Sequence, residues 1–207
     1  LDLTKMKVVT LIVSLLLVSS FAASDKCRIL SFSSGVDKIP YQVGALKAII
    51  ENLGAEDVQY DIVSGVSFGA LNAAIAAVHP KGDEKAMLEE LLNIWNNTKD
   101  ITAYQDWWLG PAQGAIYKGG LWDNTPWKAY LTKVLKGRDP ARNMTLGAVN
   151  VASGVYTELS ELMAKGDLPD AVFAASALNV YFPPVNAFNQ TWMDGAGVWP
   201  IDVIGPI

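Results

Sequence analysis

The feature that most constrains the fold is the pentapeptide at residues 65–69, GVSFG, which follows the pattern G-x-S-x-G. Its setting adds more than the pattern, because a strand pattern at 58–63 precedes it and a helical apolar repeat follows as far as Val78. The two glycines leave room for a sharp turn that lifts the hydroxyl of Ser67 clear of the sheet. The segment therefore predicts a nucleophilic serine on a strand–helix turn; the alternative is a glycine-rich helix cap without chemistry.

The rest of the chain alternates between strand and helix patterns. Buried strands are predicted at 27–32, 58–63 and 145–153, and a short last strand at 191–193. Helices are predicted at 41–53, from the serine turn to residue 78, at 84–95 and at 168–177. Ile39 is expected to stay outside the first helix because it precedes Pro40. This alternation predicts an α/β domain whose mainly parallel sheet is covered on both faces.

A nucleophilic serine needs a base, and the only histidine of the chain is His79. It follows Ser67 on the same predicted helix, about 18 Å away at ~1.5 Å per residue, which is far beyond hydrogen-bond reach. Either a histidine lies beyond Ile207, or a carboxylate activates the serine directly. Asp194 is the candidate carboxylate, because it opens a small-residue turn, DGAG, after the last predicted strand. An ordinary Asp-Gly turn is the alternative.

A histidine beyond Ile207 would make the chain an ordinary α/β-hydrolase with a Ser-His-Asp triad. That fold has several strands before its nucleophile turn. Here only one predicted strand and one predicted helix precede the strand that leads into the turn. The sequence therefore favours the carboxylate.

The N-terminus carries a targeting pattern. Residues 6–7 (MK) precede an apolar run at 8–18, and small residues then lead to Ala23. A short positive region, an apolar stretch and a small-residue exit predict a signal peptide at 1–23, with residues 1–5 upstream of its start. An uncleaved membrane anchor is the alternative, but a span needs about 20 apolar residues and this run is shorter. We therefore expect a protein that is secreted or held in the lumen of the secretory pathway.

Other features agree with passage through that pathway. Three Asn-x-Ser/Thr triplets are candidates for N-glycosylation, at Asn96, Asn143 and Asn189. The single cysteine, Cys27, has either a partner beyond Ile207 or the role of a buried thiol. The folded domain is expected to span 27–207 and to be incomplete at its C-terminal end.

The charge balance excludes some partners. The chain has 21 acidic and 16 basic residues, a net charge of −5, and no basic run. Phosphate binding needs clustered Lys and Arg, so this balance argues against a nucleic-acid partner. It also gives no sign of electrostatic docking to anionic lipid, and it does not identify a protein partner.

Four blocks of the chain, in the correct order, resemble the patatin-like phospholipase family. They are residues 41–46 (YQVGAL), 60–74 (YDIVSGVSFGALNAA), 174–185 (AASALNVYFPPV) and 193–196 (MDGA). The resemblance spans roughly residues 28–202, and four ordered blocks are more specific than any single motif.

The resemblance implies a three-layer α/β/α sandwich with a mainly parallel central sheet. It implies that Ser67 is the nucleophile and Asp194 the base of a Ser–Asp dyad without histidine. The substrate would be a lipid or membrane surface, with acyl esters of phospholipids, galactolipids or neutral lipids cleaved through an acyl-enzyme, without metal or other cofactor. For that role Asp194 would be partly buried, which raises its pKa toward the working pH.

The oxyanion loop departs from the family pattern. Of the positions 34–39 that align with it, only Gly35 and Lys38 match. The expected oxyanion-hole donors are the backbone N–H groups of Gly35 and Val36. Val36 is β-branched and resists a positive φ angle, and Ile39 is similarly restricted. The alternative to an active enzyme is therefore a catalytically weak or inactive patatin-like protein that binds or stores lipid.

Aromatic residues gather between residues 95 and 130, interleaved with glycines. They could line an acyl pocket or seat the protein at a lipid surface, and ordinary core burial is the alternative. Trp107 and Trp108 are the pair expected to contact substrate or interface, because adjacent residues cannot both face one core.

Overall fold

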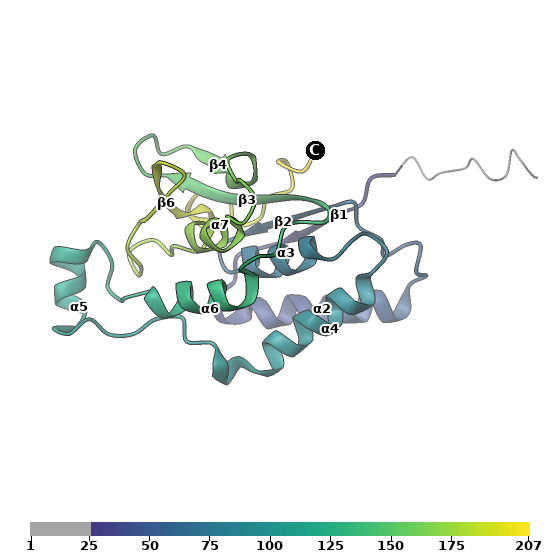
Figure 1. Ribbon diagram of the computed structural model, residues 1–207, viewed down its shortest axis with the longest axis horizontal. Coiled ribbons are helices and arrows are strands. Elements are labelled where there is room, and N and C mark those ends of the chain that lie inside the picture. Colours follow the sequence, from purple (N-terminus) through teal and green to yellow (C-terminus); the bar gives the residue numbers. More distant parts are fainter. Residues whose placement is uncertain (1–25) are drawn as a thin grey trace, which may run out of the picture.

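The computed structural model describes residues 26–207, except for the side chain of Asp100. The predicted signal peptide at 1–23 lies outside the described residues. Figure 1 shows a sheet with helices gathered beneath it and one short helix projecting at the far left.

Six strands form one mixed sheet. They are β1 (Ile29–Phe32), β2 (Ile62–Val66), β3 (Asn143–Asn150), β4 (Tyr156–Glu158), β5 (Val185–Ala187) and β6 (Gln190–Asp194). Their order is β1-β2-β3-β6-β5, and β4 also pairs with β3. β1, β2 and β3 are parallel, whereas β4, β5 and β6 pair antiparallel with their neighbours. The predicted α/β class, with parallel strands at the centre of the sheet, is confirmed.

The α-helices are α2 (Ile39–Asn52), α3 (Gly69–Val78), α4 (Glu84–Asn96), α5 (Gly110–Gln113), α6 (Thr125–Leu135) and α7 (Leu168–Ala175). Short turns of other helix types are η1 (Val36–Lys38), η2 (Thr98–Asp100), η3 (Gly114–Lys118), η4 (Leu159–Glu161) and η5 (Gly195–Gly197). Within residues 26–207, no helix combines the length and the apolar character that crossing a bilayer requires.

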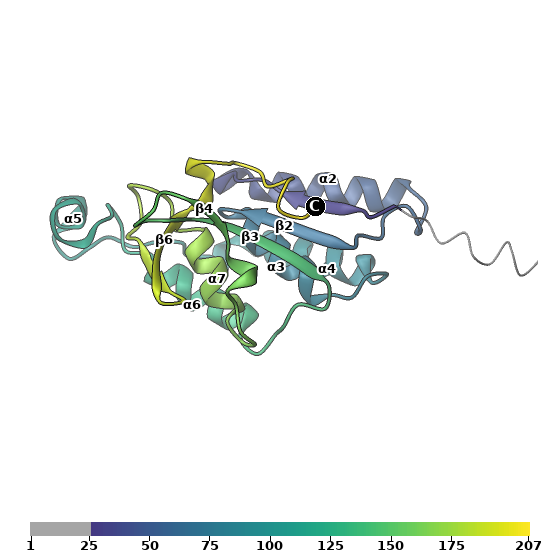
Figure 2. The ribbon, with the colours of Figure 1, turned by 90° about the horizontal axis from the view of Figure 1, so that it is seen from above.

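The helices α3 and α7 pack directly on one face of the sheet. In Figures 1 and 2, α2, α4 and α6 lie on that same side, with α4 against both α2 and α3 and α6 against α7. The other face of β2 is covered by the irregular segment 198–207. There the hydroxyl of Ser64 donates to the carbonyl oxygen of Asp202 at 2.7 Å, and the N–H of Ser34 donates to the carbonyl oxygen of Pro200 at 2.7 Å. In the described residues this segment forms the third layer.

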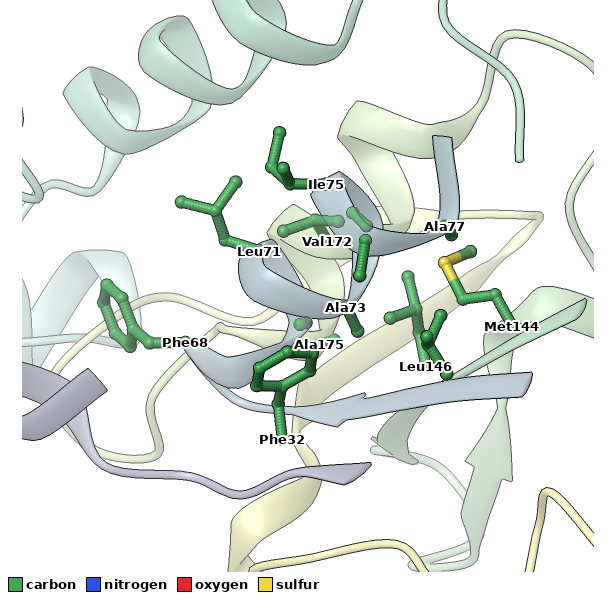
Figure 3. Packing of buried hydrophobic residues seen from close by; sticks show 14 of the residues in the cluster. Phe32, Phe68, Leu71, Ala73, Ile75, Ala77, Met144, Leu146, Val172 and Ala175 are labelled. Atoms are coloured by element: carbon green, nitrogen blue, oxygen red, sulfur yellow. The ribbon is translucent and has the colours of Figure 1, made fainter. Parts of the chain in front are cut away.

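The core lies between the sheet and α3. Figure 3 shows Phe32, Met144 and Leu146 from the strands pointing toward this helix. Leu71 and Ile75 of α3 are fully buried, and burial of each such side chain contributes roughly 1.5–3 kcal/mol. Small alanines along α3 allow the helix to lie close to the strands, and this closeness fixes the position of the turn that joins β2 to α3.

Several element boundaries differ from the sequence prediction by a few residues, and two of the differences have a clear tertiary reason. The strand predicted at 58–63 instead spans Ile62–Val66, because the first residue of β1, Ile29, pairs with Ile62 and leaves residues 58–61 without a partner strand. The prediction that Ile39 stays outside the first helix was wrong. Ile39 begins α2 with helical angles, and its fully buried side chain outweighs the weak local bias of a residue before proline.

Candidate active site

Ser67 lies on the turn between β2, which ends at Val66, and α3, which begins at Gly69. The predicted strand–helix turn is therefore confirmed. The φ angle of Ser67 is 60°, in the left-handed region, and residues held there store about 1–3 kcal/mol of backbone strain. Such strain is characteristic of a turn that presents a functional side chain rather than of an ordinary helix cap.

Close backbone contacts around Ser67 explain the two glycines of the motif. A Cβ atom at Gly65 would lie 2.6 Å from the Cβ of Ala73, so β2 can meet α3 only through a glycine. A Cβ atom at Gly69 would lie 2.4 Å from the carbonyl oxygen of Ser33. The turn is thus held between its own helix and the loop that follows β1.

Sheet register brings Asp194 to Ser67. Val66 of β2 pairs with Gly147 of β3, and the next residue of β3, Ala148, pairs with Asp194 of β6. Neighbouring strands lie about 4.7–4.9 Å apart, so the serine and the aspartate flank the same residue of β3 from opposite sides. The hydroxyl of Ser67 donates to Oδ2 of Asp194 at 2.5 Å.

The route of Asp194 to the site differs from the sequence interpretation. From sequence, Asp194 is expected in a small-residue turn after the last strand of a mainly parallel sheet. In the structure β6 runs antiparallel to β3, and Asp194 is its last residue. The two residues meet because of the register between β3 and β6, which a local pattern does not encode.

Burial controls the electrostatics of Asp194. Its side chain is 1% exposed, and no basic side chain among residues 26–207 forms an ion pair with it. Burial raises the pKa of Asp194 to about 6, although hydrogen bonds from the Ser67 hydroxyl and the Ala196 N–H lower it in part. The Ala196 N–H donates to Oδ1 at 2.8 Å. The two oxygens therefore have separate tasks: Oδ1 fixes the carboxyl group, and Oδ2 faces the serine.

The turn after Asp194 has no room for a larger residue than glycine. A Cβ atom at Gly195 would lie 2.6 Å from the carbonyl oxygen of Gly147 and 3.0 Å from the Tyr156 ring. The hydroxyl of Tyr156 donates to Asp202 at 3.1 Å. This cluster on the far side of β3 holds the backbone of the aspartate turn in place.

The loop after β1 supplies the candidate oxyanion donors. The N–H of Ser34 is occupied by Pro200, whereas in the described part of the chain the N–H groups of Gly35 and Val36 have no hydrogen-bond partner. Val36 adopts a φ of 46° despite its branched side chain. The expected resistance of Val36 to a positive φ is therefore overcome by its surroundings. Ile39 needs no such angle, because it is an ordinary helical residue.

An apolar cavity of about 450 Å³ lies beside the serine turn. Phe68, the residue after the serine, and Val36 both contribute to its wall. Most of the remaining wall is aromatic or aliphatic, and includes Trp95, Ile101, Tyr104, Trp122, Trp127, Leu178, Tyr181 and Phe182. The cavity thus connects the nucleophile turn with the oxyanion loop and offers space for an apolar chain.

Trp107 and Trp108 do not contribute to this wall. The indole N–H of Trp107 donates to the carbonyl oxygen of Gly120 at 3.0 Å, and Trp108 is 91% exposed. Other aromatic residues of the segment 95–130 do line the cavity, as the pocket interpretation expected, but the pair singled out for substrate or interface contact does not. Helical spacing within α6 puts Trp127 on the buried face beside Leu131, which is the one local signal that could have indicated it.

The remaining candidates lie elsewhere. His79 caps the far end of α3 and pairs with Glu90 at 2.7 Å, so it takes no part in the site. The glycosylation candidates are all exposed, namely Asn96, Asn143 and Asn189. Cys27 is also exposed, so the buried-thiol interpretation was wrong. Within residues 26–207, no three His, Cys, Asp or Glu side chains gather in a way that could hold a metal ion.

Comparison with known proteins agrees with this geometry. The sequence model of the family described as patatin-like phospholipase matches residues 30–203. No curated protein matched the chain in a sequence search. The family match covers nearly the whole described chain and includes both Ser67 and Asp194. The chain therefore belongs to the patatin-like phospholipase family.

Proposed function

We propose that the protein is a serine acyl hydrolase that cleaves lipid acyl esters through an acyl-enzyme, with Ser67 and Asp194 as its catalytic dyad. Membership of a lipid acyl hydrolase family supports the reaction class. The observation that carries the proposal is the 2.5 Å hydrogen bond from the strained serine to a buried carboxylate. This contact supports the proposal, because a nucleophilic serine needs its base within hydrogen-bond reach.

In the acylation step Oγ of Ser67 attacks the ester carbonyl carbon while its proton passes to Oδ2 of Asp194. The negative charge that develops on the carbonyl oxygen is stabilised by the N–H groups of Gly35 and Val36. When the intermediate collapses, the bond to the alcohol oxygen breaks and Asp194 returns the proton to that oxygen. The acyl group is then bonded to Ser67, and its chain occupies the apolar cavity.

Deacylation repeats these steps with water in place of the alcohol. Asp194 takes a proton from the water while the water oxygen attacks the acyl carbon. The bond between that carbon and Oγ of Ser67 then breaks, Asp194 returns the proton to Oγ, and the carboxylic acid leaves. A carboxylate of ordinary pKa would be a weak base for this task. The raised pKa of Asp194, about 6, brings its basicity closer to neutral pH.

A direct test is covalent labelling with a fluorophosphonate probe followed by mass spectrometry. Ser67 is expected to carry the adduct, and turnover of a chromogenic medium-chain ester is expected to stop in proportion to labelling. An intact protein that neither labels nor turns over the ester would favour the alternative, a lipid-binding or storage protein without activity.

The strained oxyanion loop motivates the alternative of an inactive lipid-binding or storage protein. The strain at Val36 also leads to a prediction about the stability of the fold. Val36→Gly is expected to raise the free energy of unfolding by about 1 kcal/mol, because a non-glycine residue in the left-handed region costs about 1–2 kcal/mol. Hydrolysis should be retained, since the backbone N–H rather than the side chain donates to the oxyanion. Chemical denaturation and ester turnover measure the two effects.

Val180→Gly is the matched control, because Val180 also has a positive φ, 71°, and lies outside the oxyanion loop. Both variants should gain similar stability. A loss of more than about tenfold in turnover for Val36→Gly alone would contradict the backbone role and assign the function to the side chain.

The buried carboxylate also predicts the pH dependence of the reaction. Asp194 accepts the serine proton only when it is ionised, so kcat/KM should rise with pH through about 6 and then level off. The measurement is initial-rate kinetics on a soluble ester between about pH 4 and 8, together with thermal unfolding to confirm that the protein stays folded.

A histidine side chain could also cause kcat/KM to rise with pH in this range, so His79→Gln is the necessary control. We call this rise the acidic limb of the pH profile. A glutamine side chain can still hydrogen-bond to Glu90, which preserves the local structure. The limb is expected to persist unchanged in this variant. Its disappearance in His79→Gln, or a parent limb near the ordinary aspartate value of 3.8, would contradict the assignment of the base.

We infer that the enzyme is made in the secretory pathway and carries N-linked glycans, a view supported by the exposure of all three acceptor asparagines. Expression in a eukaryotic secreting host followed by glycosidase treatment tests it. No change in mass after that treatment would contradict glycosylation.

A further inference from the structure

The segment that projects at α5 has an unusual surface. Four large apolar side chains there are exposed, Trp108 by 91%, Leu109 by 64%, Ile116 by 70% and Tyr117 by 78%. Figures 1 and 2 both show α5 at one end of the molecule, away from the sheet and the other helices. We call residues 107–120 the tip.

The tip is nearly free of charge. Lys118 is the only charged residue in the stretch 107–122 (WWLGPAQGAIYKGGLW), although the chain contains 16 basic and 21 acidic residues. Its ammonium nitrogen lies 5.5 Å from the centroid of the Trp107 ring. The tip therefore contains no acidic group that phosphate would repel, and apart from Lys118 it contains none of the charged groups that normally hydrate a projecting surface.

The base of the tip is closely packed. A Cβ atom at Gly114 would lie 2.2 Å from the carbonyl oxygen of Gly120, and that oxygen also accepts the indole N–H of Trp107. A Cβ atom at Gly120 would lie 2.3 Å from the backbone of Phe182. The exposed side chains are thus held on a folded unit that is fixed to the wall of the cavity.

Exposed apolar side chains extend from the tip to the rim of the cavity. The N–H of Trp122 donates to the carbonyl oxygen of Tyr181 at 2.9 Å, and the two rings stack with centroids 5.4 Å apart. Both residues line the cavity. Tyr181 is 45% exposed, and nearby Tyr104 and Val180 are 51% and 68% exposed.

We propose that the tip enters the surface of a lipid aggregate and places the cavity mouth against it. The inference rests on the proposed function, which requires a substrate acyl chain to leave a lipid phase. Trp and Tyr on an uncharged projecting unit have the composition that stabilises a position at a membrane–water boundary. A second copy of the chain is a poorer occupant, because a stable protein interface takes about 20–30 residues a side.

Vesicle binding tests the proposal without relying on catalysis. The double variant Leu109→Ser/Ile116→Ser is compared with a control of exposed aliphatic residues on and beside α2, Ile49→Ser/Leu53→Ser, all in a Ser67→Ala background. Affinity for phosphatidylcholine vesicles, measured by cosedimentation, should fall about tenfold or more for the tip variant and within about twofold for the control. Equal affinities for the two double variants would overturn the proposal.

A local readout excludes binding through other parts of the chain. Emission from Trp108, obtained as the difference between the parent and Trp108→Phe, should be quenched by vesicles of brominated phosphatidylcholine. Unquenched Trp108 emission in vesicle-bound protein would overturn the proposal. A second result would also overturn the proposal: the parent self-associates, the tip variant does not, and neither binds vesicles. The occupant of the tip would then be a second copy of the chain.

Comparing a soluble substrate with vesicle lipid separates the role of the tip in binding from the role of the catalytic dyad in hydrolysis. With Ser67 retained, hydrolysis of a soluble short-chain ester should be the same in Leu109→Ser/Ile116→Ser as in the parent, while hydrolysis of vesicle lipid falls with binding. A parent that binds vesicles through the tip but hydrolyses neither substrate would support the tip and reject the proposed function.

Discussion

Replacing Ser67 by Ala is expected to lower kcat/KM for a chromogenic medium-chain ester by about 10⁴-fold or more, because no covalent acyl-enzyme can then form. The chain offers no substitute nucleophile at this position. Ser67 is 1% exposed and is held at a φ of 60°. Alanine can adopt the same backbone at a similar cost, so the fold should persist and the loss should reflect chemistry. Steady-state kinetics at equal concentrations of folded protein measures the effect, with the active fraction of the parent titrated by the fluorophosphonate probe.

Ser64→Ala is the matched control for this result. Ser64 lies three residues earlier on β2, is fully buried, and also makes hydrogen bonds through its hydroxyl. Its loss should cost about 1 kcal/mol of stability and leave hydrolysis within about threefold of the parent. A Ser67→Ala protein that retains more than about a hundredth of the parent activity would exclude Ser67 as the nucleophile.

The serine turn could be predicted from sequence because the relevant physics is local. A strand pattern, two small residues and a helical repeat determine the turn, and the contacts at Gly65 and Gly69 show why larger residues do not fit. The exclusion of His79 as the base of Ser67 was also a local inference, because the length of α3 separates the two residues. Neither feature depends on contacts with distant segments of the chain.

The position of Asp194 depended on information that the chain does not carry locally. Its carboxylate was identified by its motif and family resemblance, but β6 runs antiparallel to β3, and the register with Ala148 determines the contact. The wall of the cavity was even harder to predict from sequence. Its wall combines Trp95, Trp122 and Tyr181 from three separate segments. Local reasoning therefore selected Trp107 and Trp108, which are close in sequence to the wall but do not form it.

Val36 shows how tertiary contacts can override a residue preference. Its branched side chain disfavours the left-handed region, yet it adopts a φ of 46° there. The neighbouring N–H of Ser34 donates to Pro200, and the next helix is anchored by the buried Ile39. The loop is fixed at both ends, so the residue between them accepts the strain. A sequence pattern alone would judge this loop degenerate, whereas the structure leaves its two donor N–H groups available.

Asp194→Asn is the second substitution with a large expected effect, and it should change activity and stability in opposite directions. Asparagine cannot accept the serine proton, so kcat/KM should fall by about 10²–10⁴-fold. The side chain can still accept the N–H of Ala196 through Oδ1 and can donate its amide to Oγ of Ser67. No buried polar atom should therefore lose its partner.

The stability change follows from the pKa of Asp194. Because the pKa is raised from 3.8 to about 6, the folded protein binds this proton more tightly than the unfolded chain does. Stability from Asp194 is therefore complete below the unfolded value of 3.8 and is lost as the pH rises through about 6. At pH 7–8 the buried charge costs up to about 3 kcal/mol, which asparagine removes. Asp194→Asn should thus unfold at higher denaturant concentration than the parent at pH 7.5, and the difference should vanish near pH 4.

Asp202→Asn separates this effect from the general consequences of replacing a buried aspartate. Asp202 is also 1% exposed but accepts hydrogen bonds from Tyr156 and from two backbone N–H groups, on the far side of β3. Its variant should retain hydrolysis to within about tenfold, because it does not contact Ser67. If Asp194→Asn instead lowered stability at pH 7.5 and kept most of the activity, the carboxylate would be a structural anchor and not the base. A gain in stability together with the loss of turnover would mean that the protein maintains a costly buried charge at Asp194 because the reaction requires it.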